Sequence, residues 1–221
     1  MAYRGVLLDF YGTLVDEDDP VIAGIVGRIE RRHPGSDAGG SWSRAFSDAV
    51  GAAHRDAFRT QRDIAVSSLA ATLRELGSSL DPEELLQEQF AYWRAPAVRP
   101  DAVAFLTTLE LPVCVISNID REDLDAALEH TGLPLANVVA SDDIRSYKPR
   151  AELFEEGLRM LALPASEVLH VGDSVSSDIG GANALGIDVA WVNTHSRDLP
   201  QTMSVVQECR ELTELLPLLT R

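Results

Sequence analysis

The sequence is poor in cysteine, in positive charge and in long apolar runs. Only two cysteines, Cys114 and Cys209, occur in 221 residues and they lie far apart, which favours a reduced intracellular protein over a disulfide framework. Lys and Arg number 19 against 35 acidic residues, and the formal net charge of -16 argues against nucleic acid as a partner. No apolar stretch reaches the roughly 20 residues that span a bilayer, and the first residues lack the shape of a signal peptide. We therefore expect a cytoplasmic protein without nucleic-acid or membrane partners; composition says nothing of its oligomeric state.

From residue 100 onward, strand-like and helix-like segments alternate. The pattern predicts strands at 113–116, 138–140, 168–171 and 189–192, helices at 122–131, 151–161 and 177–185, and a candidate closing helix at 211–219. The apolar run before Asp9 adds a first strand, for about five in all. Such alternation implies parallel strands, buried on both faces and joined by right-handed crossovers. The predicted fold is therefore α/β, a Rossmann-like parallel sheet flanked by helices.

Between the first strand and residue 96, strand-like runs are absent. Helical patterns begin at Asp19 and near Ser41, Asp63 and Asp81, and they extend to about residues 33, 58, 76 and 93. The proline-bearing segment 95–100 cannot continue the last helix. We predict a four-helix insert at 16–95 and a core formed by 1–15 and 96–221. The linkers near 15–16 and 96–100 are expected to let the insert open and close over the core.

Polar residues follow four consecutive predicted strands. Asp9 follows the first strand, Ser117 and Asn118 the second, residues 141–143 the third, and Asp173 the fourth. Ligands of open parallel sheets bind beyond the carboxyl ends of the strands. Any one of these polar groups is also what a turn requires, but four at the same edge predict a binding site.

At these positions the chain resembles the haloacid dehalogenase superfamily. Its order of motifs is matched by Asp9-Phe10-Tyr11-Gly12-Thr13-Leu14, then Ser117-Asn118, then Lys148-Pro149, then Gly172-Asp173 with Asp178. The helical insert directly after the first motif resembles the cap domain of that family. The resemblance covers nearly the whole chain, and it implies a hydrolase that acts on a small molecule through a nucleophilic aspartate.

The resemblance also implies a role for each matched residue. Asp9 would be the nucleophile, and Thr13 would orient it or cap the following turn. Lys148 would bridge the nucleophile and the anionic group of the substrate, which neutralises the charge that develops during attack. Phosphoryl oxygens need positioned donors. The expected substrate-binding residues are Ser117, Asn118, Lys148 and Tyr11.

A magnesium site is part of the same resemblance. The side chains of Asp9 and Asp173 and the backbone carbonyl of Tyr11 would bind Mg²⁺, a hard cation that takes oxygen ligands. Two carboxylates that converge without a cation repel each other, so the pair is physically awkward without metal. Asp178 is expected to support the site by holding Asp173, a lysine or a metal-bound water.

Tyr11 stands where the phosphatases of this family have the acid that protonates the leaving alcohol. The Asp-x-Tyr-Gly-Thr pattern is similar to the L-2-haloacid dehalogenases, in which halide leaves as a stable anion and neither acid nor metal is required. Two features depart from that group. The fourth motif contains Asp173 instead of a Ser-Ser-Asn sequence, and Arg44 is the only candidate we name for the arginine that its early cap supplies.

The phosphatase interpretation explains Asp173 and Asp178 but leaves the general acid unassigned, with His33, His54 and Asp56 of the insert as candidates. We predict a Mg²⁺-dependent phosphatase that acts on a small phosphorylated metabolite through an aspartyl-phosphate intermediate. The alternative is a metal-independent L-2-haloacid dehalogenase. The second alternative is a catalytically weak protein that binds a phosphorylated ligand.

Overall fold

The computed structural model describes residues 3–220, and its centre is a six-stranded sheet in which every neighbouring pair is parallel. The order across the sheet is β3-β2-β1-β4-β5-β6. The strands are β1 (Gly5–Leu8), β2 (Val113–Ser117), β3 (Val138–Ala140), β4 (Val168–Gly172), β5 (Asp188–Val192) and β6 (Gln207–Cys209). This confirms the α/β, Rossmann-like class that the alternating pattern predicts.

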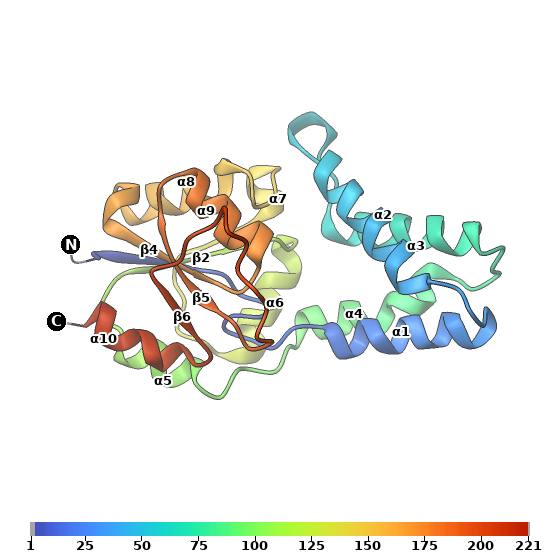
Figure 1. Cartoon of the computed structure of the whole chain (residues 1–221), viewed down its shortest axis with the longest axis horizontal. Helices are drawn as coiled ribbons and strands as arrows, with labels where there is room; N and C mark the ends of the chain where they lie inside the picture. Colours follow the sequence, from blue (N-terminus) through green and yellow to red (C-terminus); the bar gives the residue numbers. More distant parts are fainter. Residues whose placement is uncertain (1–2, 221) are drawn as a thin grey trace.

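Helices cover both faces of the sheet (Figure 1). All four residues of β1 are buried, and successive side chains point to opposite faces, so Leu7 joins one apolar cluster while Val6 and Leu8 join the other. One layer contains α8 (Ala151–Leu161) and α9 (Gly181–Ala184). The other contains α5 (Ala102–Thr108), α6 (Arg121–Thr131) and α10 (Leu216–Leu219). The continuous apolar run before Asp9 follows directly from this double burial.

Strands are added on both sides of β1. The chain first adds β2 and β3 on one side of β1, and then returns to place β4, β5 and β6 on the other. The carboxyl ends of β1 and β4 therefore flank the point where a parallel sheet forms its ligand crevice. Asp9 follows β1 directly, and its backbone N–H donates to the carbonyl of Val171 in β4 at 2.9 Å. The nucleophile candidate is thus fixed at the middle of the sheet.

Four long helices form the insert between β1 and β2, and in Figure 1 they stand beside the sheet layers. Capping residues start three of them. The Asp37 carboxylate accepts from the N–H of Gly40, the Thr60 hydroxyl from that of Asp63, and the Asp81 carboxylate from that of Glu83. The helices are α1 (Asp19–Arg32), α2 (Ala38–Ala52), α3 (Gln61–Glu75) and α4 (Pro82–Arg94), with a 3-10 turn at Arg55–Ala57.

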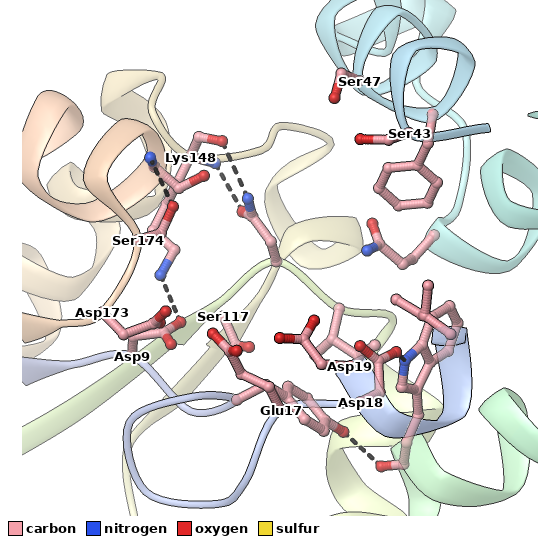
Figure 2. Close-up of a pocket in the computed structure, with 18 of the residues that line it drawn as sticks. Asp9, Glu17, Asp18, Asp19, Ser43, Ser47, Ser117, Lys148, Asp173 and Ser174 are labelled. Carbon is pink, nitrogen blue, oxygen red and sulfur yellow. Dashed lines mark hydrogen bonds and ion pairs between the residues drawn. The ribbon is translucent and has the colours of Figure 1, made fainter. Parts of the chain in front are cut away.

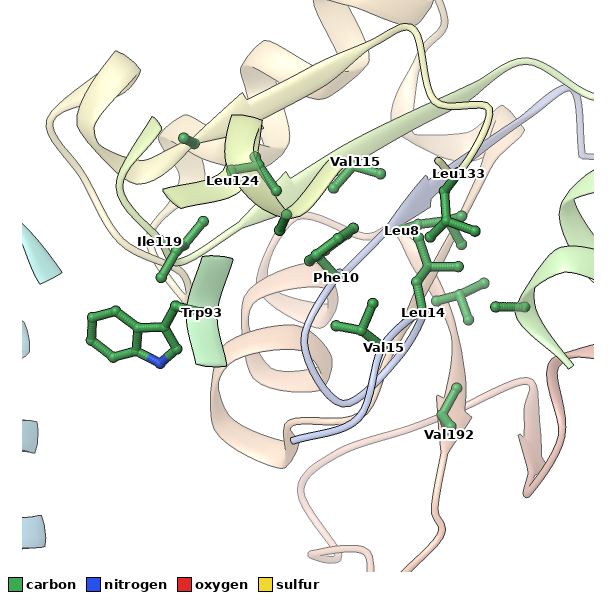
Figure 3. Close-up of a cluster of buried hydrophobic side chains, with 14 of the residues drawn as sticks. Leu8, Phe10, Leu14, Val15, Trp93, Val115, Ile119, Leu124, Leu133 and Val192 are labelled. Atoms are coloured by element: carbon green, nitrogen blue, oxygen red, sulfur yellow. The ribbon is translucent and has the colours of Figure 1, made fainter. Parts of the chain in front are cut away.

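The insert contacts the core through charged and apolar groups. The Asp120 carboxylate accepts from the backbone N–H groups of Gln61 and Arg62 at the start of α3, at 2.7 and 3.0 Å. The Arg62 guanidinium makes two hydrogen bonds to the buried carboxylate of Asp123, at 2.7 and 2.6 Å. Trp93 of α4 packs in the same apolar cluster as Ile119 of the core (Figure 3). These contacts bring the insert against the carboxyl edge of the sheet.

The two linkers to the insert run side by side. Val15 and Val98 form an antiparallel bridge, the Asp16 N–H donates to Ala97 O at 2.9 Å, and the Arg99 N–H donates to Leu14 O at 3.1 Å. The division into a core at 1–15 and 96–221 and a helical domain at 16–95 stays a prediction, as does the opening of the linkers. Within residues 3–220, no helix is both long and apolar enough to cross a bilayer.

Several local predictions were wrong or incomplete. The expected count of about five strands misses β6, because Gln207–Cys209 is short and partly polar and carries no apolar run. The second insert helix begins at Ala38 behind Asp37, not at Ser41, and it ends at Ala52. The expected helix at 177–185 is a π-helix at Val175–Gly180 followed by α9. The closing helix at 211–219 is a 3-10 turn, Leu212–Leu215, followed by α10. Short helices α5 and α7 (Ser141–Ile144) were not foreseen.

Candidate active site

A cavity of about 520 Å³ lies between the carboxyl edge of the sheet and helices α1 to α4 (Figure 2). The motif residues that line it come from four separate loops or strand ends. They are Asp9, Tyr11, Ser117, Asn118, Lys148, Asp173 and Asp178. The tertiary structure therefore brings these motif residues together, whereas Thr13, which is buried, and residues 141–143, which follow the third strand, are not part of the lining.

Lys148 is the central cation of this cavity and the single lysine of the 221-residue sequence. Its side chain is 2 % exposed, and its ammonium contacts Asp9 Oδ1 at 2.6 Å and Asp178 Oδ1 at 2.7 Å. The backbone of Lys148 is held by Asn118, whose Oδ1 accepts from its N–H at 2.7 Å and whose Nδ2 donates to its carbonyl at 3.0 Å. Asn118 thus positions the lysine, because both ends of its amide are engaged by that backbone.

Asp178 collects hydrogen-bond donors from three parts of the chain. Its Oδ1 is also hydrogen-bonded to His170 Nε2 at 2.9 Å, and its Oδ2 accepts from the backbone N–H of Ser174 at 3.0 Å. A Cβ at Gly172 would lie 2.4 Å from Asp178 Cγ, so only glycine leaves room for this carboxylate. His170 in β4 is fully buried and helps to hold Asp178 in place.

The carboxylates respond to this crowding in opposite ways. Burial, followed by the charges of Asp178 and Asp173 and opposed by Lys148, raises the pKa of Asp9 to about 7. Burial, the charge of Asp178 and a hydrogen bond with Glu17 raise the pKa of Asp173 to about 8. Burial opposes ionisation of Asp178 too, but Lys148 and His170 outweigh it and hold the pKa of Asp178 below its usual range. Asp178 is therefore a permanent anion, while Asp9 and Asp173 lack sufficient positive charge around them.

The donor set fits a hard divalent cation. Carboxylate oxygens of Asp9, Asp173 and Asp178 lie within 4.8 Å of one another. Asp178 is already committed to Lys148, His170 and a backbone N–H, which leaves Asp9 and Asp173 as the side chains available to Mg²⁺. The contribution of the Tyr11 carbonyl stays a prediction.

A family model described as haloacid dehalogenase-like hydrolase matches residues 3–186 of the sequence. The chain belongs to this family of hydrolases. It is 26% identical over 197 residues to a (S)-2-haloacid dehalogenase of Pseudomonas sp. (strain YL), with 86% of this chain and 82% of that protein covered. It is 24% identical over 195 residues to the pyrophosphatase PpaX of Halalkalibacterium halodurans, with 87% and 84% covered.

The fold of the family is equally clear among solved structures. The HAD-hydrolase YfnB of Bacillus subtilis, solved bound to magnesium, superposes with a TM-score of 0.76 at 20% identity, and all of both chains is covered. At that identity the likeness shows the fold alone. Relatives with both dehalogenase and phosphatase names share this haloacid dehalogenase-like scaffold, so the reaction has to be argued from the site.

Two residues of the first motif behave differently from expectation. The Tyr11 hydroxyl donates to the carbonyl of Trp93 at 2.5 Å, and burial, followed by the charges of Asp123 and Asp18, raises the pKa of Tyr11 above its normal range. Tyr11 therefore keeps its proton and lines the cavity with its ring. The buried hydroxyl of Thr13 has no hydrogen-bond partner within residues 3–220, so neither of the two contacts expected of it is formed.

The candidates from the insert lie away from the cavity. Arg44 is on the surface beside Asp37, with 68% of its side chain exposed, and cannot cover a substrate carboxylate. His54 contacts Glu152 at 2.7 Å, and neither it nor His33 or Asp56 lines the cavity. These candidates were wrong, because sequence spacing alone does not say which face of an insert helix meets the core.

Four charged residues that line the cavity, Glu17, Asp18, Asp19 and Arg197, were not predicted to belong to the site, and two of them contact Asp173. Arg197, from the loop after β5, donates to the carbonyl and to Oδ2 of Asp173, both at 3.1 Å. Glu17, in the turn before α1, hydrogen-bonds with Asp173, and burial raises its pKa. Arg197 follows no motif, and only its position after a strand of the same sheet edge could have indicated it. Glu17 lies in the acidic run after the first motif, which was assigned to the start of the insert.

Proposed function

We propose that this hydrolase is a Mg²⁺-dependent phosphatase of a small phosphorylated metabolite, acting through an aspartyl-phosphate intermediate. One observation carries the proposal: the carboxylates of Asp9, Asp173 and Asp178 are packed together, and the cations that contact them, Lys148 and Arg197, are fewer than the carboxylates. A phosphoryl group brings further negative charge to this point. Such a site binds its substrate only with an added cation, and the oxygen donors suit Mg²⁺.

The residues of the chain divide the work of the reaction between them. A carboxylate oxygen of Asp9 attacks phosphorus and forms a new bond, and the bond from phosphorus to the ester oxygen breaks. Because position 11 supplies no acid, the departing oxygen takes its proton from a water molecule. Lys148 and the hydroxyl of Ser117 bind phosphoryl oxygens, while Asn118 and Asp178 hold Lys148 in place. Water then hydrolyses the acyl phosphate and restores Asp9. Asp9, Asp173 and the carbonyl of Tyr11 would hold Mg²⁺, which would supply neutralisation of the negative charge on the phosphoryl oxygens.

The insert supports the same proposal as a cap over the site. We assign residues 16–95 to this cap and the remainder to the core. The contacts of Asp120 with the start of α3 and of Arg62 with Asp123 hold the insert over the cavity, which shields the reacting phosphoryl group from bulk solvent. The pyrophosphatase name of a relative across 87% of the chain agrees with phosphoryl transfer.

A second candidate, a metal-independent haloacid dehalogenase, is favoured by one observation. The proton of Tyr11 is committed to Trp93, so position 11 supplies no acid, and a leaving halide needs none. The (S)-2-haloacid dehalogenase of Pseudomonas sp. (strain YL) is also a relative over 86% of the chain. Against this candidate stand Asp173 in the fourth motif and the exposed position of Arg44.

One pair of assays decides between the two reactions. Protein dialysed against a chelator is given p-nitrophenyl phosphate with and without Mg²⁺, and, in parallel, L-2-chloropropionate with chloride release as the readout. We expect hydrolysis of the phosphate only with Mg²⁺, and loss of turnover in Asp9→Asn by at least about a thousandfold. Asp48→Asn, an exposed residue of α2, is the matched control and keeps full activity. Chloride release without metal would overturn the proposal, and silence in both assays would favour a protein that only binds a phosphorylated ligand.

A further inference from the structure

The half of the cavity that faces away from Asp9 has a marked imbalance of charge. This leaving-group half consists of Asp18, Asp19 and the lining residues of α1 to α4. Among the described lining residues of this half, Asp18 and Asp19 are acidic and no residue is basic. The two cations of the cavity, Lys148 and Arg197, belong to the core and are bound to the carboxylates of Asp9, Asp178 and Asp173. A leaving group with a second anion would therefore meet uncompensated negative charge.

The hydrogen-bonding groups of this half are biased in the same direction. The indole N–H of Trp42 donates to the Ser68 hydroxyl at 3.1 Å, and that of Trp93 donates to Asp18 Oδ2 at 2.8 Å. The Gln89 amide donates to the same oxygen of Asp18 at 2.8 Å, which fixes its orientation. Gln89 is 4% exposed, and its Oε1 has no partner within residues 3–220. The two indole N–H groups and the Gln89 amide N–H are thus engaged within the protein, whereas Gln89 Oε1 and the hydroxyls of Ser43 and Ser47, which can accept as well as donate, remain for a ligand.

Asp18 and Asp19 have no Lys or Arg partner within residues 3–220. Asp18 receives only neutral donors, from Gln89 and Trp93. Asp19, in the first turn of α1, points into the cavity in Figure 2 and makes no salt bridge within residues 3–220. Its one histidine neighbour among the described residues is His195, which contacts Glu17 at 3.3 Å and does not line the cavity. Trp42 and Phe46 of α2 line the same space with aromatic surface. Carboxylates together with aromatic side chains are the combination that attracts an organic cation.

We propose that the substrate is a phosphate monoester of an amino alcohol, whose ammonium group lies in the leaving-group half against Asp19 and the aromatic side chains of α2. This proposal rests on the phosphatase function proposed above and names its substrate class. The ammonium supplies the positive charge that this half lacks, and its N–H groups donate to the acceptors there. It adds no anion beyond the phosphoryl group held by Lys148 and the metal.

The test is a series of three substrates of similar size that differ in leaving-group charge: O-phosphoethanolamine, propyl phosphate and 2-carboxyethyl phosphate. With Mg²⁺ present, we expect kcat/KM to be at least about fivefold higher for the ammonium ester than for the neutral ester, and lowest for the carboxylate. Asp19→Asn is expected to remove most of the preference for the ammonium ester and to relieve the discrimination against the carboxylate. Asp48→Asn, exposed on α2 and outside the cavity, is the matched control and keeps the wild-type ratios.

The possible outcomes distinguish a wrong substrate class from a wrong phosphatase assignment. Mg²⁺-dependent hydrolysis of p-nitrophenyl phosphate together with equal rates on the three esters would overturn the substrate class and leave the phosphatase standing. An Asp19→Asn variant that changes only the concentration of Mg²⁺ required, with the preference intact, would assign Asp19 to a cation site and also overturn the proposal. Binding of the three esters to the Asp9→Asn variant, measured by calorimetry, repeats the comparison without turnover; equal affinities there count against the proposal as well.

Discussion

Replacement of Asp178 by asparagine tests the electrostatic account of the site. Asp178 is 1% exposed and accepts hydrogen bonds from Lys148, His170 and the N–H of Ser174. Asparagine has the same shape, but its amide NH₂ group is a donor. It would face another donor, either the ammonium of Lys148 or the backbone N–H of Ser174. The variant also leaves the buried ammonium of Lys148 with Asp9 as its single carboxylate partner at 2.6 Å.

Breaking a buried ion pair typically costs about 3–5 kcal/mol of folding free energy. Because Asp9 still neutralises part of the Lys148 charge, we expect the lower end of that range, about 3 kcal/mol, at pH 7.5 without metal. Hydrolytic activity should fall by about 10–100-fold, since Lys148 loses the group that orients it. Urea unfolding followed by circular dichroism measures the first quantity, and Mg²⁺-dependent hydrolysis of p-nitrophenyl phosphate measures the second.

The matched control is Asp125→Asn, which removes a carboxylate that is 60% exposed from a pair with Arg121 on α6. Its cost should be about 0.5 kcal/mol or less, and its activity should be unchanged. A loss below about 1 kcal/mol in Asp178→Asn would refute the reasoning, because it would mean that Lys148 does not depend on this partner for burial.

Three further predictions follow from the same contacts. The pKa of Asp9 is raised to about 7 and that of Asp173 to about 8, so each carboxyl group must lose its proton before a cation binds. Calorimetry should therefore show Mg²⁺ affinity rising from pH 6 to pH 8, by up to about tenfold per pH unit for each ligand. An affinity independent of pH would contradict the raised pKa values. Gly157→Ala would place a Cβ 2.7 Å from Leu7 Cδ2, where α8 packs on β1, and thermal unfolding should show that the protein loses about 1–3 kcal/mol of stability. The control is Gly51→Ala in α2, which has open space around it and should be neutral or slightly stabilising. Arg44→Ala should leave the rate with every substrate unchanged, because this side chain lies on the surface; a marked fall with L-2-chloropropionate would restore the dehalogenase candidate.

The sequence predicted what depends on neighbouring residues. The apolar run at β1, the strand β3 and the helix α8 were placed at their observed bounds or within a residue of them, because their burial leaves a direct pattern of apolar side chains. Polar residues at the ends of four strands predicted the edge of the sheet that carries the cavity. The short edge strand β6 and the π-helix at Val175–Gly180 were not predicted, since neither has a periodic apolar pattern of its own.

The sequence by itself thus determined the α/β scaffold, the helical insert and the motif residues that meet in the cavity, because each leaves a local signal in residue type and spacing. Only the tertiary structure decided how those residues act on one another. It placed Asn118 on the backbone of Lys148, committed the proton of Tyr11 to Trp93, and put Arg197 against Asp173. It also placed Arg44 on the surface, away from the cavity. The physical reason is that charge, burial and hydrogen-bond partners depend on distances between segments far apart in the chain, which the crossover order of the sheet and the packing of the insert set.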